Sequence, residues 1–260
     1  MVDDATDPIA AAARLLTEAR YVIALTGAGL SVESGIPPFR GPGGLWTKYG
    51  EPPMNGYERF LADPRKAWED RLNPSGPMRE LWKALGAARP NPGHEAFVRL
   101  ERLGILRATI TQNVDDLHRQ AGSEHLLEIH GNATLIRCVE CVARFEQADV
   151  DTTTLPPACP RCGGILKSDT VSFGEPIPPD VLARCQEESE QADCCLVAGT
   201  SATVYPAAHF PVAVRERGGA LIEVNPHETE ISGMCAVSLR APSGEVLPRV
   251  VERIEADRRA

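Results

Sequence analysis

The stretch from Gly27 to Arg40 reads Gly-Ala-Gly-Leu-Ser-Val-Glu-Ser-Gly-Ile-Pro-Pro-Phe-Arg, and it follows an apolar run, Tyr-Val-Ile-Ala-Leu, at 21–25. Such a run is typical of a parallel strand that is buried on both faces. A glycine-rich turn after it lets the backbone approach a ligand, and a helix that starts there offers free N–H groups to a phosphate. The spacing departs from the usual G-x-G-x-x-G, because the third glycine is Gly35, so the pattern alone also fits a turn without a ligand.

The composition limits the class of protein. The chain has 260 residues and a net charge of −9 at pH 7. A general nucleic-acid-binding surface is basic, so we expect no direct nucleic-acid partner. The charge suits a basic partner such as a lysine-bearing protein tail. No stretch has the length of a membrane span, and the acidic start, Met-Val-Asp-Asp, differs from a signal peptide, so we expect a cytoplasmic protein without membrane contact.

Four of the eight cysteines form two C-x-x-C pairs, Cys138 with Cys141 and Cys159 with Cys162. The spacing between the pairs is typical of a four-cysteine zinc site, although iron on four thiolates has the same signature. Four cysteines fill a tetrahedral zinc and leave no open position for water. We therefore expect one structural Zn²⁺ that stabilises an insert too small for a core of its own.

Helical and strand patterns alternate along the chain. Asp7 and Pro8 are typical of a helix start, and that helix is expected to end near Ala19. Further strands are expected at 106–111, 126–129, 194–198, 220–224 and 235–239, and helices at 57–71, 76–87, 93–103, 205–217 and from 243. The alternation predicts an α/β fold, a doubly wound parallel Rossmann-like sheet with a smaller helical and zinc-binding domain.

The expected domains are discontinuous in sequence. The large domain comprises 1–45, 104–134 and 167–260, and the small domain combines a helical module at 46–103 with the cysteine insert at 135–166. Residues 41–46 are expected to form a mobile loop beside the ligand. An ordinary surface loop fits the same residues. Residues 166–175 are expected to form a strand that returns to the main sheet.

Polar side chains follow several of the expected strands. Asn113 and Asp115 come directly after the strand at 106–111, where an amide and a carboxylate can bind a nicotinamide carboxamide and ribose hydroxyls. Capping of the next helix is the alternative. His130 stands at a strand end before a glycine, where an imidazole can face a crevice and accept a proton near neutral pH.

These features together resemble the sirtuins, the Sir2 family of NAD-dependent protein deacylases, of the prokaryotic type. The resemblance covers nearly the whole chain and rests on five motifs in order, among them the glycine turn, Thr-Gln-Asn-x-Asp-x-Leu-His at 111–118 and the cysteine pairs. The segment Lys-Ser-Asp-Thr-Val-Ser-Phe-Gly-Glu at 167–175 is similar to the family's K-P-x-V-V-x-F-G-E. Ser168 and Thr170 depart from that pattern.

The resemblance implies an enzyme that transfers the acyl group of an acyl-lysine protein or peptide to ADP-ribose and releases nicotinamide and free lysine. His130 would be the base that acts on a ribose hydroxyl, and Asn113 would be the second catalytic residue. The implied NAD contacts are Gly27, Ala28, Gly29, Ser31, Phe39, Arg40, Trp46, Gln112, Asn113, Asp115, Gly199, Thr200, Ser201, Asn225 and Ser243. The implied substrate contacts are Val171, Phe173, Gly174 and Glu175.

Sirtuins that prefer succinyl or malonyl groups carry a Tyr-x-x-Arg pair, and an ungapped alignment puts those positions at Arg71 and Pro74. The pair is absent, so we expect acetyl or another uncharged acyl group, although Arg71 alone can contact a carboxylate. Two alternatives remain at this stage: a mono-ADP-ribosyltransferase, and a catalytically silent NAD-binding module. The oligomeric state is expected to be a monomer.

Overall fold

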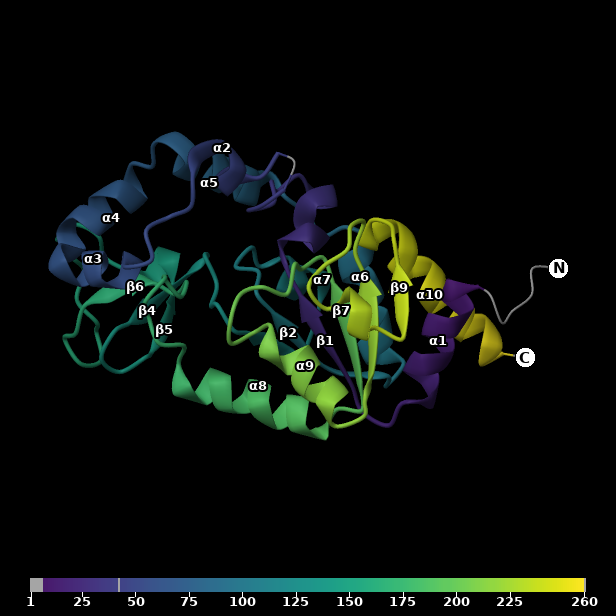
Figure 1. The fold of residues 1–260 in the computed structure, drawn as a ribbon. Coiled ribbons are helices and arrows are strands. Elements are labelled where there is room, and N and C mark those ends of the chain that lie inside the picture. The colour runs from purple at the N-terminus through teal and green to yellow at the C-terminus, as the bar shows by residue number, and fades with distance from the viewer. Residues whose placement is uncertain (1–6, 42, 260) are drawn as a thin grey trace.

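The computed structural model describes residues 7–41 and 43–259, and a six-stranded sheet forms the centre of its larger part (Figure 1). The strand order is β3-β2-β1-β7-β8-β9, and every neighbouring pair is parallel. The strands are β1 (Val22–Thr26), β2 (Leu106–Thr111), β3 (Leu126–Glu128), β7 (Cys194–Ala198), β8 (Ala220–Val224) and β9 (Val237–Leu239). The expected doubly wound parallel sheet is confirmed.

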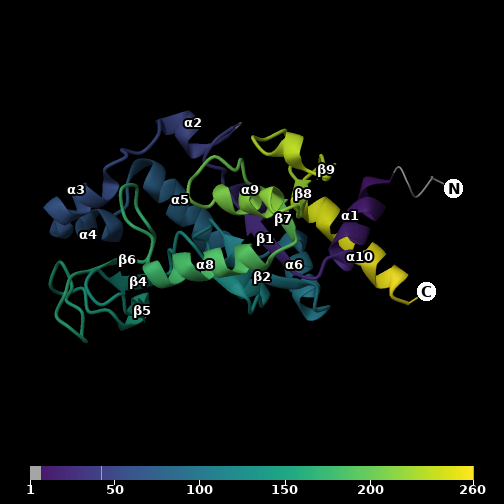
Figure 2. The same ribbon diagram turned by 60° about the horizontal axis from the view of Figure 1, so that its bottom comes forward.

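Helices cover both faces of this sheet, which explains why its central strands are apolar on both sides. One face packs against α1 (Pro8–Glu18), α6 (Pro92–Arg102) and α10 (Ser243–Asp257). The other face packs against α8 (Pro179–Gln191) and α9 (His209–Glu216), as Figure 2 shows. Residues 205–208 form turns, so α9 begins four residues later than expected.

The first helix illustrates how local sequence determines an element. The side chain of Asp7 accepts a hydrogen bond from the backbone N–H of Ile9 at 3.0 Å, and Pro8 occupies the first helical position. Ala12, Ala13 and Leu16 then form the buried face of α1. The N-cap and the apolar spacing were both readable from the sequence.

A chain of short helices follows the glycine turn: α2 (Leu45–Tyr49), α3 (Gly56–Ala62), α4 (Pro64–Leu72) and α5 (Gly76–Ala87). The single helix expected at 57–71 is wrong, because Pro64 lacks an N–H and the chain restarts there. Asp63 caps the new helix by accepting from the backbone N–H of Lys66 at 2.9 Å. Of the loop expected at 41–46, Pro42 lies outside the described residues and Trp46 belongs to α2.

A second, three-stranded antiparallel sheet with order β5-β4-β6 carries the cysteine pairs. Its strands are β4 (Leu135–Cys138), β5 (Arg144–Glu146) and β6 (Leu166–Ser168). The expectation that the segment from Leu166 returns to the main sheet is wrong, because β6 pairs with β4. Trp68 of α4 packs on this sheet and donates its indole N–H to the carbonyl of Leu166 at 2.7 Å. The domain boundaries themselves stay a prediction.

The strand order reverses between β1 and β7, since β2 and β3 lie on one side of β1 and β8 and β9 lie beyond β7. The carboxyl ends of the strands at such a reversal open into a crevice, which is the usual ligand position in open α/β sheets. In the described part of the chain, no helix is both long and apolar enough to cross a bilayer.

Candidate active site and metal centre

The turns after β1 and β7 form one continuous surface at this crevice. The N–H of Gly27 donates to the carbonyl of Ala198 at 3.1 Å, and the N–H of Gly29 donates to the carbonyl of Gly199 at 2.7 Å. Gly199 has φ 62°, and a Cβ there would lie 2.2 Å from the backbone nitrogen of Leu30. Side chains are therefore excluded where the two turns meet, and the backbone is exposed to a ligand.

The segment after Gly27 is a 3₁₀ helix, η1 (Ala28–Ser34). It borders a cavity of about 1910 Å³, a volume larger than one drug-sized ligand fills. The cavity is lined by most of the residues that the sequence singled out: Gly27, Ala28, Gly29, Phe39, Arg40, Trp46, Gln112, Asn113, His130, Val171, Phe173, Gly174, Glu175, Gly199, Thr200, Ser201 and Asn225. Ser31, Asp115 and Ser243 are buried and are not among the described lining residues.

Ser31 and Asp115 lie behind Asn113 rather than at the cavity surface. The amide nitrogen of Asn113 donates to the carbonyl of Gly27 and to Ser31 Oγ, both at 3.1 Å. Ser31 Oγ in turn donates to Asp115 Oδ2 at 2.6 Å. Asp115 also accepts from the backbone N–H of Leu117 at 3.0 Å, but the N-cap position of the helix that begins there is Asp116, whose side chain makes no capping hydrogen bond. Burial raises the pKa of Asp115, and these hydrogen bonds oppose that rise.

A second set of hydrogen bonds joins the ends of three strands. Gln112, after β2, donates its side-chain amide to Thr200 Oγ1 at 2.8 Å, and Asn225, after β8, donates to the carbonyl of Thr200 at 3.1 Å. Thr200 follows β7, so one residue receives contacts from the end of the neighbouring strand β8 and from the end of β2, which lies beyond β1. The polar lining is therefore held in position before any ligand binds.

His130 is the titratable group with the geometry of a base. Its Nδ1 lies 3.2 Å from the carbonyl oxygen of Gln112. A carbonyl oxygen only accepts, so Nδ1 carries the proton and Nε2 has a free lone pair. Burial lowers the pKa of His130, while the hydrogen bond to Gln112 opposes this shift. The imidazole is therefore neutral and ready to accept a proton at neutral pH.

Three aromatic rings connect the two sides of the cavity. The ring centroid of Trp46 lies 5.1 Å from that of Phe39 and 5.8 Å from that of Phe173. The guanidinium of Arg40 lies 4.5 Å over the Trp46 ring and forms an ion pair with Glu51 at 3.2 Å. The glycine-turn segment and the 167–175 segment thus contact one another through side chains.

Glu175 belongs to a buried ion network that the sequence did not indicate. Its carboxylate pairs with Arg137 at 2.6 Å and with Lys167 at 3.0 Å. All three side chains are 5–6% exposed. The carboxylate also accepts from the backbone N–H of Ser172 at 2.9 Å. Glu175, expected as a substrate contact, has its carboxylate turned into this network, because two buried cations require a counter-charge.

Glu51 and Lys167 were not found from the sequence. Glu51 pairs with Arg40 across the segment that contains α2, and nothing in a single sequence distinguishes it from other surface carboxylates. Lys167 lies in β6, where its neighbour Leu166 is buried as well, so alternation along the strand does not reveal that the lysine points inward. Both residues line the cavity.

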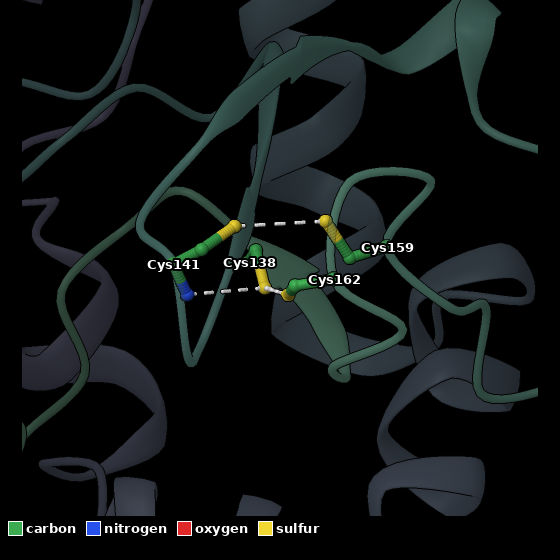
Figure 3. Close-up of side chains that lie close together, drawn as sticks. All are labelled: Cys138, Cys141, Cys159 and Cys162. Carbon is green, nitrogen blue, oxygen red and sulfur yellow. Dashed lines mark hydrogen bonds between the residues drawn. The ribbon is translucent and has the colours of Figure 1, made fainter.

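The four cysteines of the two C-x-x-C pairs converge at one point (Figure 3). Their Sγ atoms all lie within 4.8 Å of one another, with Cys138 to Cys162 at 3.5 Å and Cys141 to Cys159 at 3.7 Å. A tetrahedral zinc with Zn–S bonds of about 2.3 Å separates its sulfurs by about 3.8 Å. The four thiolates and their spacing therefore fit one structural zinc. They fill its four coordination positions, so none is left for a water ligand.

Comparison with known proteins agrees with this geometry. Residues 27–206 match the model of the Sir2 family. A NAD-dependent protein deacylase of Pyrococcus abyssi is 46% identical over 252 residues, which cover 93% of this chain and 96% of the relative. NAD-dependent protein deacylase 1 of Archaeoglobus fulgidus is 44% identical over 246 residues, with coverage of 93% and 96%.

Solved structures show the same likeness. A Sir2 homologue in complex with ADP-ribose superposes with a TM-score of 0.82 at 42% identity, covering 95% of this chain and 96% of that one. A complex of a Sir2 homologue with NAD gives 0.80 at 41% identity, with coverage of 99% and 95%. The matched family model, the relatives and the solved structures agree, and this chain belongs to the Sir2 family.

Proposed function

We propose that this chain is a NAD-dependent protein-lysine deacetylase, or more generally a deacylase, that produces nicotinamide, free lysine and O-acyl-ADP-ribose. The observation that supports this most directly is the state of His130. Its Nδ1–H is held by the carbonyl of Gln112, so its basic Nε2 is available in a cavity that also exposes the Gly27–Gly29 and Gly199 backbone. A solved Sir2 complex with a deacetylated peptide and 3′-O-acetyl-ADP-ribose, at 34% identity and a TM-score of 0.76, supports this reaction class.

The glycine turns suit the phosphates of NAD, because Gly27, Gly29 and Gly199 line the cavity and carry no side chain that would keep a phosphate away from the backbone. Asn113 suits the nicotinamide end, where its position is held by Gly27, Ser31 and, through Ser31, by Asp115. Thr200 and Asn225 suit the adenosine end. Ser31 and Asp115 support Asn113 from behind, and Ser243 is buried outside the cavity lining.

When bound, NAD supplies a ribose carbon with nicotinamide as its leaving group, and a ribose hydroxyl that receives the acyl group. Asn113 orients the cofactor, and His130 Nε2 takes the proton from the hydroxyl. Phe39, Trp46 and Phe173 line the cavity and limit the access of bulk water, whereas the release of the free lysine consumes one water molecule. The nicotinamide ring of NAD is cationic and therefore a good leaving group, so the site requires positioning of the reactants more than a strong nucleophile.

The four cysteines hold a structural Zn²⁺ outside the cavity. None of them is among the described residues that line it. The metal would supply folding energy to the β4–β5–β6 sheet, since a sheet of three short strands has little core.

An uncharged acyl group is the proposed substrate class. Arg71 lines the cavity, but Nη1 already donates to Ser168 Oγ at 3.2 Å, and Nη2 donates to the carbonyl of Ala133 at 3.2 Å and to Gln147 at 2.9 Å. Pro74 offers no second donor. Acetyl-lysine peptide should therefore turn over much faster than succinyl-lysine peptide. The reverse order would show that Arg71 exchanges its protein partners for a ligand carboxylate.

The test is mass spectrometry of an acetyl-lysine peptide incubated with the protein, with and without NAD. We expect loss of acetyl only with NAD, together with stoichiometric nicotinamide and O-acetyl-ADP-ribose. ADP-ribose attached to a peptide or protein would indicate the mono-ADP-ribosyltransferase instead. No reaction of any acyl peptide would indicate the silent NAD-binding module.

His130→Tyr is the matched control for this assay. It should abolish deacetylation while NAD binding by calorimetry remains, because the ring lies at the cavity surface and not between the glycine turns. Activity that survives the substitution would assign the base to another residue.

Acyl-lysine proteins or peptides are the proposed partners, with no direct contact to nucleic acid or membrane. The net charge of −9 supports this choice, because a basic peptide is attracted and a phosphate backbone is repelled. We further propose a monomer located in the cytoplasm. Light scattering coupled to gel filtration at the assay concentration tests the oligomeric state.

A further inference from the structure

Three buried polar atoms on one face of the main sheet have no hydrogen-bond partner among the residues that the structure describes. They are His94 Nε2, His118 Nδ1 and Thr109 Oγ1. His94 lies in α6, His118 lies in α7 (Leu117–Ala121), and Thr109 lies on β2 two residues before Thr111. All three residues are 0–2% exposed. Buried polar groups are almost always paired, so three unpaired ones in one region point to a feature that completes them.

The hydrogen bonds around His118 determine which of its nitrogens carries the proton. Thr26 Oγ1 donates its only proton to Thr111 Oγ1 at 2.9 Å. The contact between Thr26 Oγ1 and His118 Nε2, at 3.0 Å, must therefore have the imidazole as donor. In the neutral ring the proton is then on Nε2, and the unpaired Nδ1 is an acceptor.

His94 has the complementary arrangement. The backbone N–H of Asn91 donates to His94 Nδ1 at 3.3 Å, so this nitrogen is an acceptor and the proton is on Nε2. The unpaired Nε2–H is consequently a donor. The two rings meet edge to face, with centroids 5.1 Å apart. An unpaired donor on His94 thus lies near an unpaired acceptor on His118.

We propose that one buried water accepts from His94 Nε2, donates to His118 Nδ1 and contacts Thr109 Oγ1, and that His118 is thereby a positioning residue for Asn113. Such a water would have three polar partners, which is the usual number for buried water. The relay runs from Asn91 through His94, the water, His118 and Thr26 to Thr111 Oγ1, which accepts from the backbone N–H of Asn113 at 3.1 Å.

The relay begins and ends at the proposed cofactor site. Asn91, at its start, also donates its side-chain amide to the carbonyl of Leu30 and to Ser34 Oγ in η1, at 2.8 and 2.9 Å. Asn113, at its end, donates to the carbonyl of Gly27. The relay therefore supports both ends of the nicotinamide site from the side opposite the cavity. Its catalytic consequence rests on the proposed function, whereas the water and the tautomers do not.

Both imidazoles have to be neutral for this arrangement, because a protonated ring has no acceptor. Burial lowers the pKa of His94 to about 4. Burial, together with the nearby His94, lowers the pKa of His118 to about 3. The relay is thus intact throughout the neutral pH range.

The structural part is tested on the full chain loaded with zinc. A crystal structure that resolves ordered water should show one water within hydrogen-bond distance of His94 Nε2, His118 Nδ1 and Thr109 Oγ1. Long-range ¹H–¹⁵N spectra at neutral pH should show both rings protonated on Nε2. A proton on His118 Nδ1, or an ¹⁵N–¹⁵N coupling that reveals a direct bond between the rings, would overturn the proposal.

The positioning part is tested by the rate of nicotinamide exchange into NAD in three variants. His118→Leu removes the donor to Thr26 and should slow exchange about tenfold while the Kd for NAD changes little. His118→Gln places an amide N–H near the former Nε2 and should restore the rate to within about threefold. Phe97→Leu, which alters the ring packed edge-on against His118, is the control and should lower Tm without slowing exchange.

Equal losses in His118→Leu and His118→Gln, or a wild-type rate in His118→Leu, would show that His118 only fills space. A wild-type chain that neither exchanges nicotinamide nor deacetylates would refute the proposed function. The crystal structure and the spectra would in that case still decide whether the water and the tautomers are as proposed.

Discussion

Glu175→Gln is the substitution whose effect the structure determines most clearly. Glu175 is the shared partner of two buried cations, Arg137 and Lys167, at 2.6 and 3.0 Å. The other carboxylate of this ion network, that of Asp169, already pairs with both Arg137 and Arg144, each at 3.1 Å. Neutralising Glu175 therefore leaves three cations with one carboxylate.

The expected loss follows from the burial of the network. Removing one partner of a buried ion pair costs about 3–5 kcal/mol, because the remaining charge stays desolvated. Glutamine keeps the shape and can still accept from the backbone N–H of Ser172, so we expect about 3 kcal/mol, the lower end of that range. For a chain of this size the melting temperature should fall by roughly 6–12 °C.

The pH dependence of this loss has a definite sign. Burial lowers the pKa of Lys167, and Glu175 opposes that shift. Without Glu175 the folded-state pKa of the lysine falls further below its unfolded value, so the folded variant loses the proton first as pH rises. The deficit should be largest near neutral pH and should shrink on the alkaline side. Urea unfolding at several pH values measures it.

Two controls separate this account from a general effect of charge removal. Glu228→Gln removes an exposed carboxylate at the cavity and should change the free energy of unfolding by less than about 0.5 kcal/mol. Lys167→Met added to Glu175→Gln removes one unpaired cation and should recover part of the loss. A Glu175→Gln protein as stable as wild type, or a double variant less stable than either single one, would refute the reasoning. The KM for the peptide should rise more than the KM for NAD, because Glu175 holds Ser172, which lies between the implied substrate contacts Val171 and Phe173.

Three further predictions concern the metal, the backbone and pH. Chelation of the metal, or Cys138→Ser, should make the 135–168 region sensitive to protease while the six-stranded sheet survives, and unchanged protease resistance would exclude a structural metal. Gly131→Ala should lower the free energy of unfolding by more than about 2 kcal/mol, because φ is 74° and the new Cβ would lie 1.9 Å from the carbonyl oxygen of Asp169. Gly163→Ala is the matched control, since φ is 78° there but the Cβ would enter open space, so the difference between the two variants measures the clash. Burial lowers the folded pKa of His130, so kcat/KM should stay constant until the pH falls below about 6.5, and an acid limb above neutral pH would contradict this. Burial also lowers the folded pKa of His94 to about 4 and that of His118 to about 3, so the free energy of unfolding should decline from about pH 6.5 down to about 3.

Much of the main sheet could be predicted from the sequence, since its signals are local. The strand predicted at 106–111 has the same bounds as β2 in the structure. Asp7 and Pro8 correctly predicted the N-cap and the first residue of α1. The break between α3 and α4 was not predicted, although Pro64, which marks it, is visible in the sequence. Spacing alone was sufficient to predict the four-cysteine cluster.

The site was predicted as a set of residues but not as an arrangement. His130, Asn113 and the glycine turns do line one cavity. Ser31 and Asp115 were expected beside them and instead lie behind Asn113, joined to each other at 2.6 Å. Whether Ser31 and Asp115 lie at the cavity or behind Asn113 depends on how η1 packs against the end of β2. No local sequence pattern encodes this packing.

The sequence by itself therefore determined most strands of the main sheet, the glycine turn, the metal ligands and the candidate base, because period, spacing and residue chemistry are properties of short segments. Only the tertiary structure decided that β6 pairs with β4, that the carboxylate of Glu175 faces Arg137 and Lys167, and that the neutral His94 and His118 meet. These are contacts between segments distant in the chain. They are selected by burial, since a buried charge or polar atom requires a partner, and the partner is whichever residue the fold brings within reach.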